Sequence, residues 1–421
     1  MTAYFDNAAT TFPKPQVVYD FMDSFYREHG GNAGRGSHAL SLSAGKLISE
    51  TRMRLQTILH CQNKELVFAP TATIALNMIL QGLLASTPLA STPLSNRGRT
   101  EVGERSRNVV GERSRNADGE RSRTVYISPF EHNAVTRVLH HFEQNGSIKV
   151  NVLPIQSNLS YDLAEIESLF KKEKPDLLVM SHASNVVGLV QPAEKLCALA
   201  KKFCCVTVLD MAQTAGLVDL NVGLETIDFA VFAGHKTLYG PTGISGFAMK
   251  AGFDLPPVLF GGTGYESANQ EMPRDLPQRY EMGTLNISGI AGLYAATEWI
   301  LETGVETLWK KEQEHRKRLL EILGKYDFVK LVGSTPLSSH EEFQHVGIVS
   351  VLIEGLPSDT AASVFSERNI AVRSGLQCAP LAHKTLGTFP AGTVRFSTGY
   401  FTGEEDFGEL EMAMEYLKGN L

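Results

Sequence analysis

A lysine stands in a glycine-flanked turn in the segment FAGHKTLYGPTG, residues 232–243, directly after an apolar run. Burial there would disfavour the charged ammonium, lower the pKa of Lys236 and make its amine a nucleophile toward carbonyl carbon. Upstream, Asp210 ends the apolar run VTVLD and Gln213 follows three residues later. A carboxylate at that place can keep the ring nitrogen of a pyridine cofactor protonated. Taken singly, Lys236 is more often a surface lysine and Asp210 equally well a helix N-cap; together they indicate pyridoxal phosphate.

Three further segments offer groups that could surround such a cofactor. The small-residue turn PTATIALN opens a predicted helix, where free N–H groups and the Thr73 hydroxyl can face a phosphate. The segment EHNAV supplies His132, whose imidazole can stack on a ring, and SHASNVVG supplies Asn185, which can donate to a phenolic oxygen. For each of these residues alone, a capping or core role is the more frequent one.

A cysteine near the C-terminus has a setting that differs from the other four. Cys378 lies in the glycine- and proline-punctuated segment AVRSGLQCAPLAH, residues 371–383, where a thiol beside basic groups can be partly ionised and attack sulfur. Arg395, on the predicted strand VRFS, could pair bidentately with a substrate carboxylate, or form a surface salt bridge. The cysteines that fall in helix or strand patterns, and are expected to be inert, are Cys61, Cys197, Cys204 and Cys205.

The elements that would position these residues alternate along the chain from about residue 64. Strands are predicted at 65–69, 124–128, 149–153, 176–182, 206–210 and 228–234, and helices at 72–84, 134–144, 163–170 and 193–203. Most of the strands are apolar without a period of two, as expected when helices cover both faces of a mainly parallel sheet. The pattern predicts an α/β domain with ligands at the carboxyl ends of its strands.

The rhythm changes after about residue 285. Long helices are predicted at 287–302 and 305–326, followed by a strand, helix and strand at 347–355, 359–369 and 394–400. These elements predict a smaller α+β domain at the C-terminus. The expected division is an N-terminal arm at 1–20 that packs with the small domain, a large cofactor-binding domain at 21–285 and the small domain at 286–421.

One stretch breaks the pattern. Residues 86–124 contain a repeated STPL and three copies of GERSR at a strict period of eight, with many arginines and almost no apolar anchor. Such a segment cannot offset its ordering entropy by burial, so we expect an inserted, mobile surface loop. The functional alternative is a basic tether for RNA or for a partner protein.

Composition excludes several classes of protein. The 421 residues carry a net charge of −7, which argues against a protein built to coat nucleic acid or an anionic membrane. Five cysteines cannot form the disulfide framework of a small secreted domain, and the chain shows neither a signal-peptide pattern nor a long apolar run. We therefore expect a soluble cytoplasmic protein.

Several segments occur in the order of a known family along nearly the whole chain. YFDNAATT, the Asp210–Gln213 pair, GHK, RYEMGTLN, RSGLQCAPLAH and TVRFSTGYF resemble the class V aminotransferase-like pyridoxal-phosphate enzymes of fold type I. Within them the chain is most similar to the cysteine desulfurase and selenocysteine lyase branch. The resemblance implies a mainly parallel α/β large domain with a smaller α+β domain, a homodimer and pyridoxal phosphate as cofactor.

The resemblance also implies a role for each matching residue. Lys236 would hold the cofactor as a Schiff base, Asp210 would pair with its ring nitrogen, and Cys378 would be the nucleophile that forms a persulfide. The other implied contacts are His132 stacked on the ring and taking part in catalysis; Gln213 and Asn185 at the phenolic oxygen; Ala72, Thr73, His235 and, from the second subunit, Thr284 at the phosphate; and Arg395, Asn185 and Arg373 at the substrate. No metal site is expected.

Two residues depart from the family pattern. Ala233 stands where many relatives have serine, which removes a hydroxyl that would bind phosphate. Gln377 precedes the cysteine where relatives often carry histidine, which affects thiol activation and partner docking.

The resemblance implies conversion of L-cysteine to L-alanine, with sulfur carried on Cys378 for transfer to an acceptor protein or to iron–sulfur cluster assembly. Selenocysteine lyase activity, another reaction of class V enzymes, and a non-catalytic or RNA-binding role for the arginine-rich loop stay open as alternatives. No membrane or nucleic-acid partner is expected for the enzyme.

Overall fold

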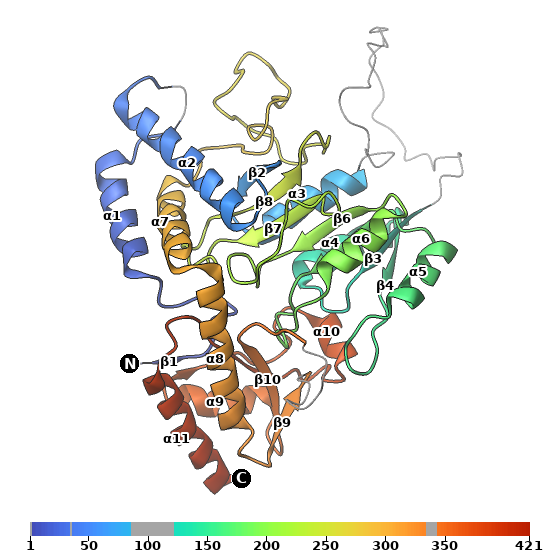
Figure 1. Cartoon of the computed structure of the whole chain (residues 1–421), viewed down its shortest axis with the longest axis vertical. Coiled ribbons are helices and arrows are strands. Elements are labelled where there is room, and N and C mark those ends of the chain that lie inside the picture. The colour runs from blue at the N-terminus through green and yellow to red at the C-terminus, as the bar shows by residue number, and fades with distance from the viewer. Residues whose placement is uncertain (1, 34–35, 86–121, 334–342) are drawn as a thin grey trace.

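The computed structural model describes residues 2–33, 36–85, 122–333 and 343–421. Its largest sheet has seven strands in the order β2-β8-β7-β6-β5-β3-β4 (Figure 1). Their bounds are β2 Lys64–Ala69, β3 Arg123–Ile127, β4 Ile148–Val152, β5 Leu177–Ser181, β6 Val206–Asp210, β7 Phe229–Ala233 and β8 Ser245–Lys250. Only β8 runs against its neighbours in this sheet, so the predicted mainly parallel α/β fold is confirmed.

Helices cover both faces of this sheet, as the apolar strands predict. Alternate residues of β5 belong to two separate cores: Leu177 and Val179 pack with α3 and α4, whereas Leu178 and Met180 pack with the helices of the other face. The helices on the first face are α3 Ala72–Ala85 and α4 Asn133–Gln144; those contributing to the second core include α2 Ala39–Ile58, α5 Leu163–Lys172, α6 Ala193–Lys201 and α7 Ile287–Thr303.

The sequence analysis missed β8, which follows the lysine turn. Its sequence SGFAMK contains a glycine, which usually weakens a strand. A Cβ built on Gly246 would lie 2.2 Å from the carbonyl oxygen of Val67 and 2.6 Å from the Phe232 ring, so only glycine fits between these neighbours. The residue that weakens the sequence pattern is thus the one that the packing requires.

The second unit is built on a three-stranded antiparallel sheet in the order β12-β10-β9. Its elements are α8 Val305–Leu323, β9 Val329–Val332, β10 Ile348–Ile353, α9 Ser358–Glu367, β11 Ile370–Ala371, α10 Pro380–Thr385, β12 Val394–Ser397 and α11 Glu404–Asn420. The strand β1 Ala3–Tyr4 pairs in parallel with β11, which brings the start of the chain against this unit.

The helix α7 packs against α1 Gln16–His29 and against α2, and its apolar residues share a core with the large sheet. The predicted boundary at residue 286 assigns this helix to the small domain, whereas its contacts lie with the large sheet. The long helix α8 then leads to the second sheet (Figure 1). The exact division of the chain into domains stays a prediction.

Most of the predicted insertion at 86–124 lies outside the described residues, so its expected mobility stays a prediction. Its predicted end is wrong, because Arg123 already begins β3 and donates from Nη1 to the carbonyl oxygen of Leu83 at 2.7 Å. Among the described helices, none is both long and apolar enough to cross a membrane.

Candidate active site

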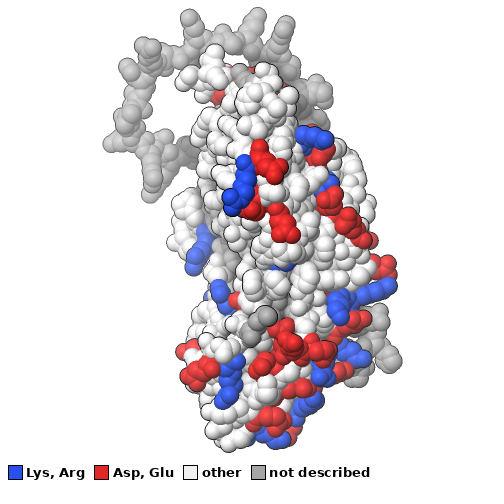
Figure 2. All heavy atoms as spheres, turned by 90° about the vertical axis from the view of Figure 1, so that its left-hand side faces the viewer, with Lys and Arg blue, Asp and Glu red and all other residues white. Residues whose placement is uncertain are grey.

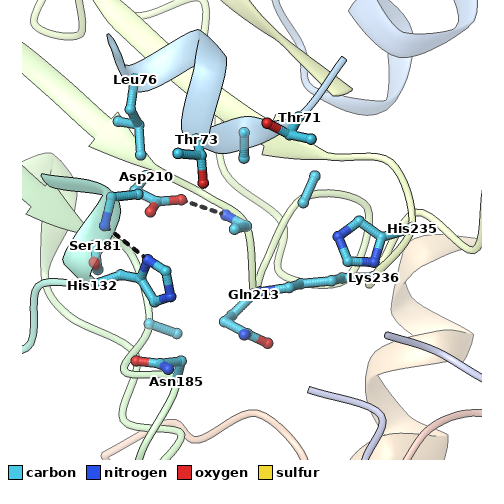
Figure 3. A pocket seen from close by; sticks show the side chains of 15 residues that line it. Thr71, Thr73, Leu76, His132, Ser181, Asn185, Asp210, Gln213, His235 and Lys236 are labelled. Carbon is cyan, nitrogen blue, oxygen red and sulfur yellow. Dashed lines mark hydrogen bonds between the residues drawn. The ribbon is translucent and has the colours of Figure 1, made fainter. Parts of the chain in front are cut away.

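A cavity of about 300 Å³ opens where β5, β6 and β7 end and α3 begins (Figure 3). Parallel strands bring their carboxyl ends to one edge of a sheet, which is why residues far apart in sequence meet here. The sequence-predicted residues that line the cavity are Ala72, Thr73, His132, Asn185, Asp210, Gln213, His235 and Lys236. Ala233 lines it as well. The structure thus brings all the predicted cofactor contacts together except Thr284.

Lys236 stands in the turn after β7, beside the cavity (Figure 3). Burial lowers the pKa of its ammonium to about 8; the negative charge of Asp210 opposes this shift, and the positive charge of Arg395 adds to it. An amine with this pKa is partly neutral near pH 7, as a nucleophile or a proton acceptor requires.

The N-terminal arm holds the turn of Lys236 in place. The carbonyl oxygen of His235 accepts hydrogen bonds from the Thr10 hydroxyl at 3.1 Å, the Thr11 amide at 3.1 Å and the Lys14 ammonium at 2.7 Å. The Thr11 hydroxyl also donates to the carbonyl oxygen of Lys236 at 2.8 Å. The sequence marks this segment as part of a family motif but does not reveal its task, because nothing in the sequence shows which distant turn the arm reaches.

Asp210 ends β6 and is buried, and burial raises the pKa of its carboxyl group. Its Oδ1 accepts the amide hydrogen of Ala212 at 2.9 Å, and its backbone carbonyl accepts the amide hydrogen of His182 at 2.8 Å. Gln213 is also buried and donates from Nε2 to the carbonyl oxygen of Ala8 at 3.0 Å. Both side chains are therefore oriented by backbone contacts.

His132 is the N-cap of α4 and also lines the cavity. Its Nδ1 accepts the amide hydrogen of Ala134 at 3.0 Å, so the neutral ring carries its proton on Nε2. Burial, reinforced by the positive charges of Lys236, Arg137 and Arg395, lowers the pKa of the ring to about 4. The ring is neutral at physiological pH, and the capping and functional roles weighed in the sequence analysis coexist in one side chain.

The cap of α3 is Thr71, not Thr73. The Thr71 hydroxyl accepts the amide hydrogen of Ile74 at 3.1 Å, while Thr73 lies in the first turn of the helix and lines the cavity. Thr73 is therefore not needed as the cap and can serve a ligand.

Cys378 lies just outside this cavity, on an adjoining groove of about 460 Å³. The groove and the cavity share Thr73, His132 and Ala134, so one wall separates the thiol from the lysine. Cys378 is exposed and, like Gln377, has a left-handed backbone, with φ of +57° and +40°. The sequence predicts the loop position of Cys378, but not its exposure or the separate groove that the thiol faces.

Arg395 lies on β12 and is 3% exposed. It donates from Nη1 to the carbonyl oxygen of Asn185 at 2.8 Å and from Nη2 to Oδ1 of Asp6 at 2.9 Å. The expected surface alternative is thus wrong. Arg373 is exposed, and its Nη1 lies 3.8 Å from Oδ2 of Asp6. Neither arginine lines the cavity itself, although Arg395 is held against Asn185, which does.

Thr284 lies on a different cavity, of about 590 Å³, between the middle of α2 and residues 262–285. It is exposed and takes no part in the lysine cavity of its own chain. A contact of Thr284 with a cofactor would therefore have to be made in the other subunit of a dimer, as the resemblance implies.

One expectation about the other cysteines is wrong. The sequence pattern predicts Cys204 within a helix or strand, whereas the residue is exposed in a turn with φ of +60°. The turn is needed because the chain reverses between α6 and β6. Cys61, Cys197 and Cys205 are buried, and burial raises the pKa of Cys61 and Cys197 to about 12, which fits inert thiols.

Comparisons with known proteins identify the family of this fold. Residues 3–92 and 100–410 match the model of the family described as Aminotransferase class-V. A probable cysteine desulfurase from Xylella fastidiosa is 29% identical over 408 residues, which cover 96% of this chain and 88% of that protein. One from Pyrococcus abyssi is 29% identical over 427 residues, which cover 99% of this chain and 95% of that protein. The solved apo structure of a cysteine desulfurase from Thermococcus onnurineus NA1 has a TM-score of 0.82 at 27% identity, covering 100% of this chain and 95% of that one. The similarity therefore spans both sheets.

Proposed function

Because this chain belongs to the class V aminotransferase family, we propose that it is a pyridoxal-phosphate-dependent cysteine desulfurase that converts L-cysteine to L-alanine and receives the sulfur on Cys378. The observation that carries this proposal is the shared wall between the lysine cavity and the groove of Cys378. Lys236 and Asp210 would serve many reactions of this cofactor, whereas the removal of sulfur also needs a nucleophilic thiol, which Cys378 offers on the adjoining groove.

The cavity fits the cofactor of the family. Nδ1 of His235 is buried and has no hydrogen-bond partner within the described residues, which suits a phosphate oxygen near the first turn of α3. Asp210 offers a carboxylate across the cavity from His235, and His132 offers a neutral ring (Figure 3). Lys236, Asp210, His132, Gln213 and Asn185 would hold the ring, and Ala72, Thr73 and His235 the phosphate.

Pyridoxal phosphate, when bound, supplies an electron sink that stabilises negative charge at the α-carbon of an amino acid. The amine of Lys236 would then have two tasks. It would bind the carbonyl carbon of the cofactor, and it would accept the α-proton of the substrate after the substrate amine has replaced the lysine at that carbon. The lowered pKa of Lys236 serves both tasks, since each needs the neutral amine. Asp210 would pair its carboxylate with the protonated ring nitrogen of the cofactor.

Cys378 performs the step that defines the reaction. Its thiolate attacks the sulfur of the substrate; an S–S bond forms, the substrate Cβ–S bond breaks, and the electron pair of that bond stays with the carbon skeleton that becomes alanine. Arg395 is proposed to hold the substrate carboxylate, assisted by Asn185 and Arg373. Arg395 is already fixed at two nitrogens, which limits its loss of rotamer freedom on binding.

The partners proposed for this enzyme follow from the cavity that Thr284 lines and from the groove that Cys378 lines. A second copy of the chain would bring Thr284 to the phosphate, and a sulfur-acceptor protein would reach the persulfide through the groove, with iron–sulfur cluster assembly as a destination. We also propose a cytoplasmic location, supported by five free cysteines, two of them exposed. On the face shown in Figure 2, basic side chains lie among acidic ones, which gives no support to an RNA-binding surface there.

The test compares the wild-type protein with Cys378→Ala and Lys236→Ala. With L-cysteine and pyridoxal phosphate, the wild type should form alanine, and under reductant sulfide, in equal amounts, and trypsin digestion should locate the persulfide at Cys378. Lys236→Ala should lose both activity and the visible absorbance of the bound cofactor, and Cys378→Ala should keep the absorbance and lose desulfuration. Absence of alanine from the wild type would refute the proposal.

The position of Cys378 outside the cavity favours one second candidate, selenocysteine lyase. Selenium is a better leaving group than sulfur and does not require attack by a thiol. If selenocysteine is the substrate, Cys378→Ala should keep selenocysteine turnover while losing cysteine turnover.

A further inference from the structure

A buried chain of hydrogen bonds runs behind the cysteine turn and reaches a histidine that the proposed mechanism does not use. His383 lies on α10 and is fully buried. Its Nε2 is 2.7 Å from Oε1 of Gln377, and its Nδ1 is 2.7 Å from the hydroxyl oxygen of Thr388. Gln377 directly precedes the proposed nucleophile.

The contacts of Gln377 fix the direction of these bonds. Its Nε2 donates to the carbonyl oxygen of Thr393 at 3.0 Å, which leaves Oε1, an acceptor, facing His383. His383 must therefore donate from Nε2 and accept the Thr388 hydroxyl hydrogen at Nδ1. Burial lowers the pKa of His383 to about 4, which agrees with this neutral form.

The same turn is held from the side of the active site. The carbonyl oxygen of Gln377 accepts a hydrogen bond from Nδ2 of Asn185 at 2.7 Å, and the carbonyl oxygen of Cys378 accepts one from the amide of Asn133 at 2.7 Å. Asn185 lines the lysine cavity, and Asn133 follows His132. The two residues of the turn both have left-handed backbones, which a non-glycine residue adopts only when its surroundings impose it.

We propose that His383 is a positioning residue for Cys378, which it holds through the side chain of Gln377 in the turn between the groove and the Asn185 side of the cavity. Without the His383 donor, Oε1 of Gln377 would be buried with only a long contact to the Thr393 hydroxyl, and the turn would lose its support from behind. This inference rests on the proposed desulfurase function, because it assigns His383 a task for that thiol.

The hydrogen bonds that Gln377 makes with His383 and Thr393 also account for the glutamine that departs from the family pattern. Position 377 needs an acceptor toward His383 and a donor toward Thr393 at the same time, and the two ends of an amide supply both. Gln377 and His383 therefore act as a pair, so that changing either should remove the same support.

The experiment uses the full-length holoenzyme in a Cys204→Ser background, so that Cys378 is the only exposed thiol. His383→Met removes both ring nitrogens at similar volume, and His383→Gln restores a donor near the place of Nε2. Gln377→Met removes the acceptor, alone and together with His383→Met. His315→Met is the matched control, since His315 is also buried and bonds Gly399 but lines neither the cavity nor the groove. Three quantities are measured: kcat and KM for L-cysteine, the alkylation rate of Cys378 by iodoacetamide, and the visible absorbance of bound cofactor.

The inference predicts that His383→Met lowers kcat about tenfold with KM changed less than about twofold, because only the thiol step loses its geometry. Alkylation of Cys378 should become faster by about threefold or more as the turn opens locally, with cofactor absorbance unchanged. His383→Gln should restore both rates, and the double variant should be no worse than Gln377→Met.

The proposal is overturned if His383→Met leaves either rate at the wild-type value, if His383→Gln fails to restore them, or if His315→Met produces the same changes. The alkylation measurement needs no turnover. If the wild type formed no alanine, the proposed function would fail, while the effect of His383 on the cysteine turn would still be decided by alkylation.

Discussion

The guanidinium of Arg395 on β12 and the carboxylate of Asp6 in the N-terminal arm lie 2.9 Å apart in a salt bridge beside the active-site cavity. The side chain of Arg395 is 3% exposed and that of Asp6 is 14% exposed, so little water reaches the pair. Arg395 also holds the carbonyl oxygen of Asn185. One ion pair therefore connects the arm, the small sheet and the cavity wall, and Asp6 sets the orientation of the arginine that we propose for the substrate carboxylate.

Removing Asp6 should therefore cost far more than removing an exposed acid. Asp6→Ala leaves a buried guanidinium without its counter-charge, and breaking such a pair typically costs about 3–5 kcal/mol of unfolding free energy. Asp23→Ala is the control, because Asp23 and Arg27 are also 2.9 Å apart but both are exposed, and solvent screening leaves such a pair little effect on stability. Urea denaturation of the two variants at pH 7 measures the difference. Equal losses would show that burial does not strengthen the Asp6 pair.

The pKa of Lys236 predicts how fast the apoprotein captures its cofactor at each pH. Burial lowers this pKa to about 8. As the pH is raised toward 8, the fraction of Lys236 in the neutral amine form therefore increases about tenfold per pH unit, and above pH 8 it levels off. The rate at which visible absorbance develops after pyridoxal phosphate is added should follow the same curve. Asp210→Asn should move the curve to lower pH, since the charge of Asp210 raises the pKa of Lys236.

A model amine provides the control for this pH profile. Nα-acetyl-lysine, with an ordinary pKa near 10.4, should react with the cofactor at a rate that still climbs above pH 9. A protein profile that climbs in parallel with the model amine would mean that the Lys236 ammonium is not desolvated.

The sequence was sufficient for the residues that lie at the ends of apolar strands. Asp210 and Lys236 follow buried runs, and parallel pairing then dictates that they share an edge of the sheet. The strand β8 could not be predicted in the same way, because Gly246 is there for a close backbone approach that only the folded chain creates.

Contacts made by the arm and by the cysteine turn were equally out of reach. Lys14 and His235 are 221 residues apart, and no local pattern shows that the ammonium of one reaches the carbonyl of the other. Gln377 departs visibly from the family pattern, but nothing around His383 in the sequence marks it as the partner of Gln377. Periodicity reports which face of an element is buried, whereas these hydrogen bonds depend on tertiary contacts.

His132 combines a helix cap with a ring that lines the cavity, and two substitutions should separate these roles. His132→Asn keeps an acceptor for the Ala134 amide and removes the ring, so stability should stay within about 0.5 kcal/mol while alanine formation falls strongly. His132→Phe keeps a ring and removes the cap. This variant should lose about 1 kcal/mol of stability, and its loss of activity should be smaller than that of the asparagine variant. Thermal unfolding and alanine assays measure the two effects. The assignment of the ring to the cofactor is wrong if both variants lose activity to the same extent.

Substitutions of His235 and Ala233 should change the affinity for pyridoxal phosphate in opposite directions. Nδ1 of His235 is buried without a partner in the described part of the chain, so a phosphate oxygen would satisfy it, and bonds to charged groups are worth about 1.5–3 kcal/mol. His235→Ala should therefore weaken pyridoxal-phosphate binding by about tenfold or more, and Ala233→Ser, which adds a hydroxyl to the cavity wall, should strengthen it several-fold. Equilibrium dialysis with pyridoxal, which lacks the phosphate, provides the comparison: its affinity should change little in either variant. Equal losses for both ligands would place His235 at the ring or in the fold, and not at the phosphate.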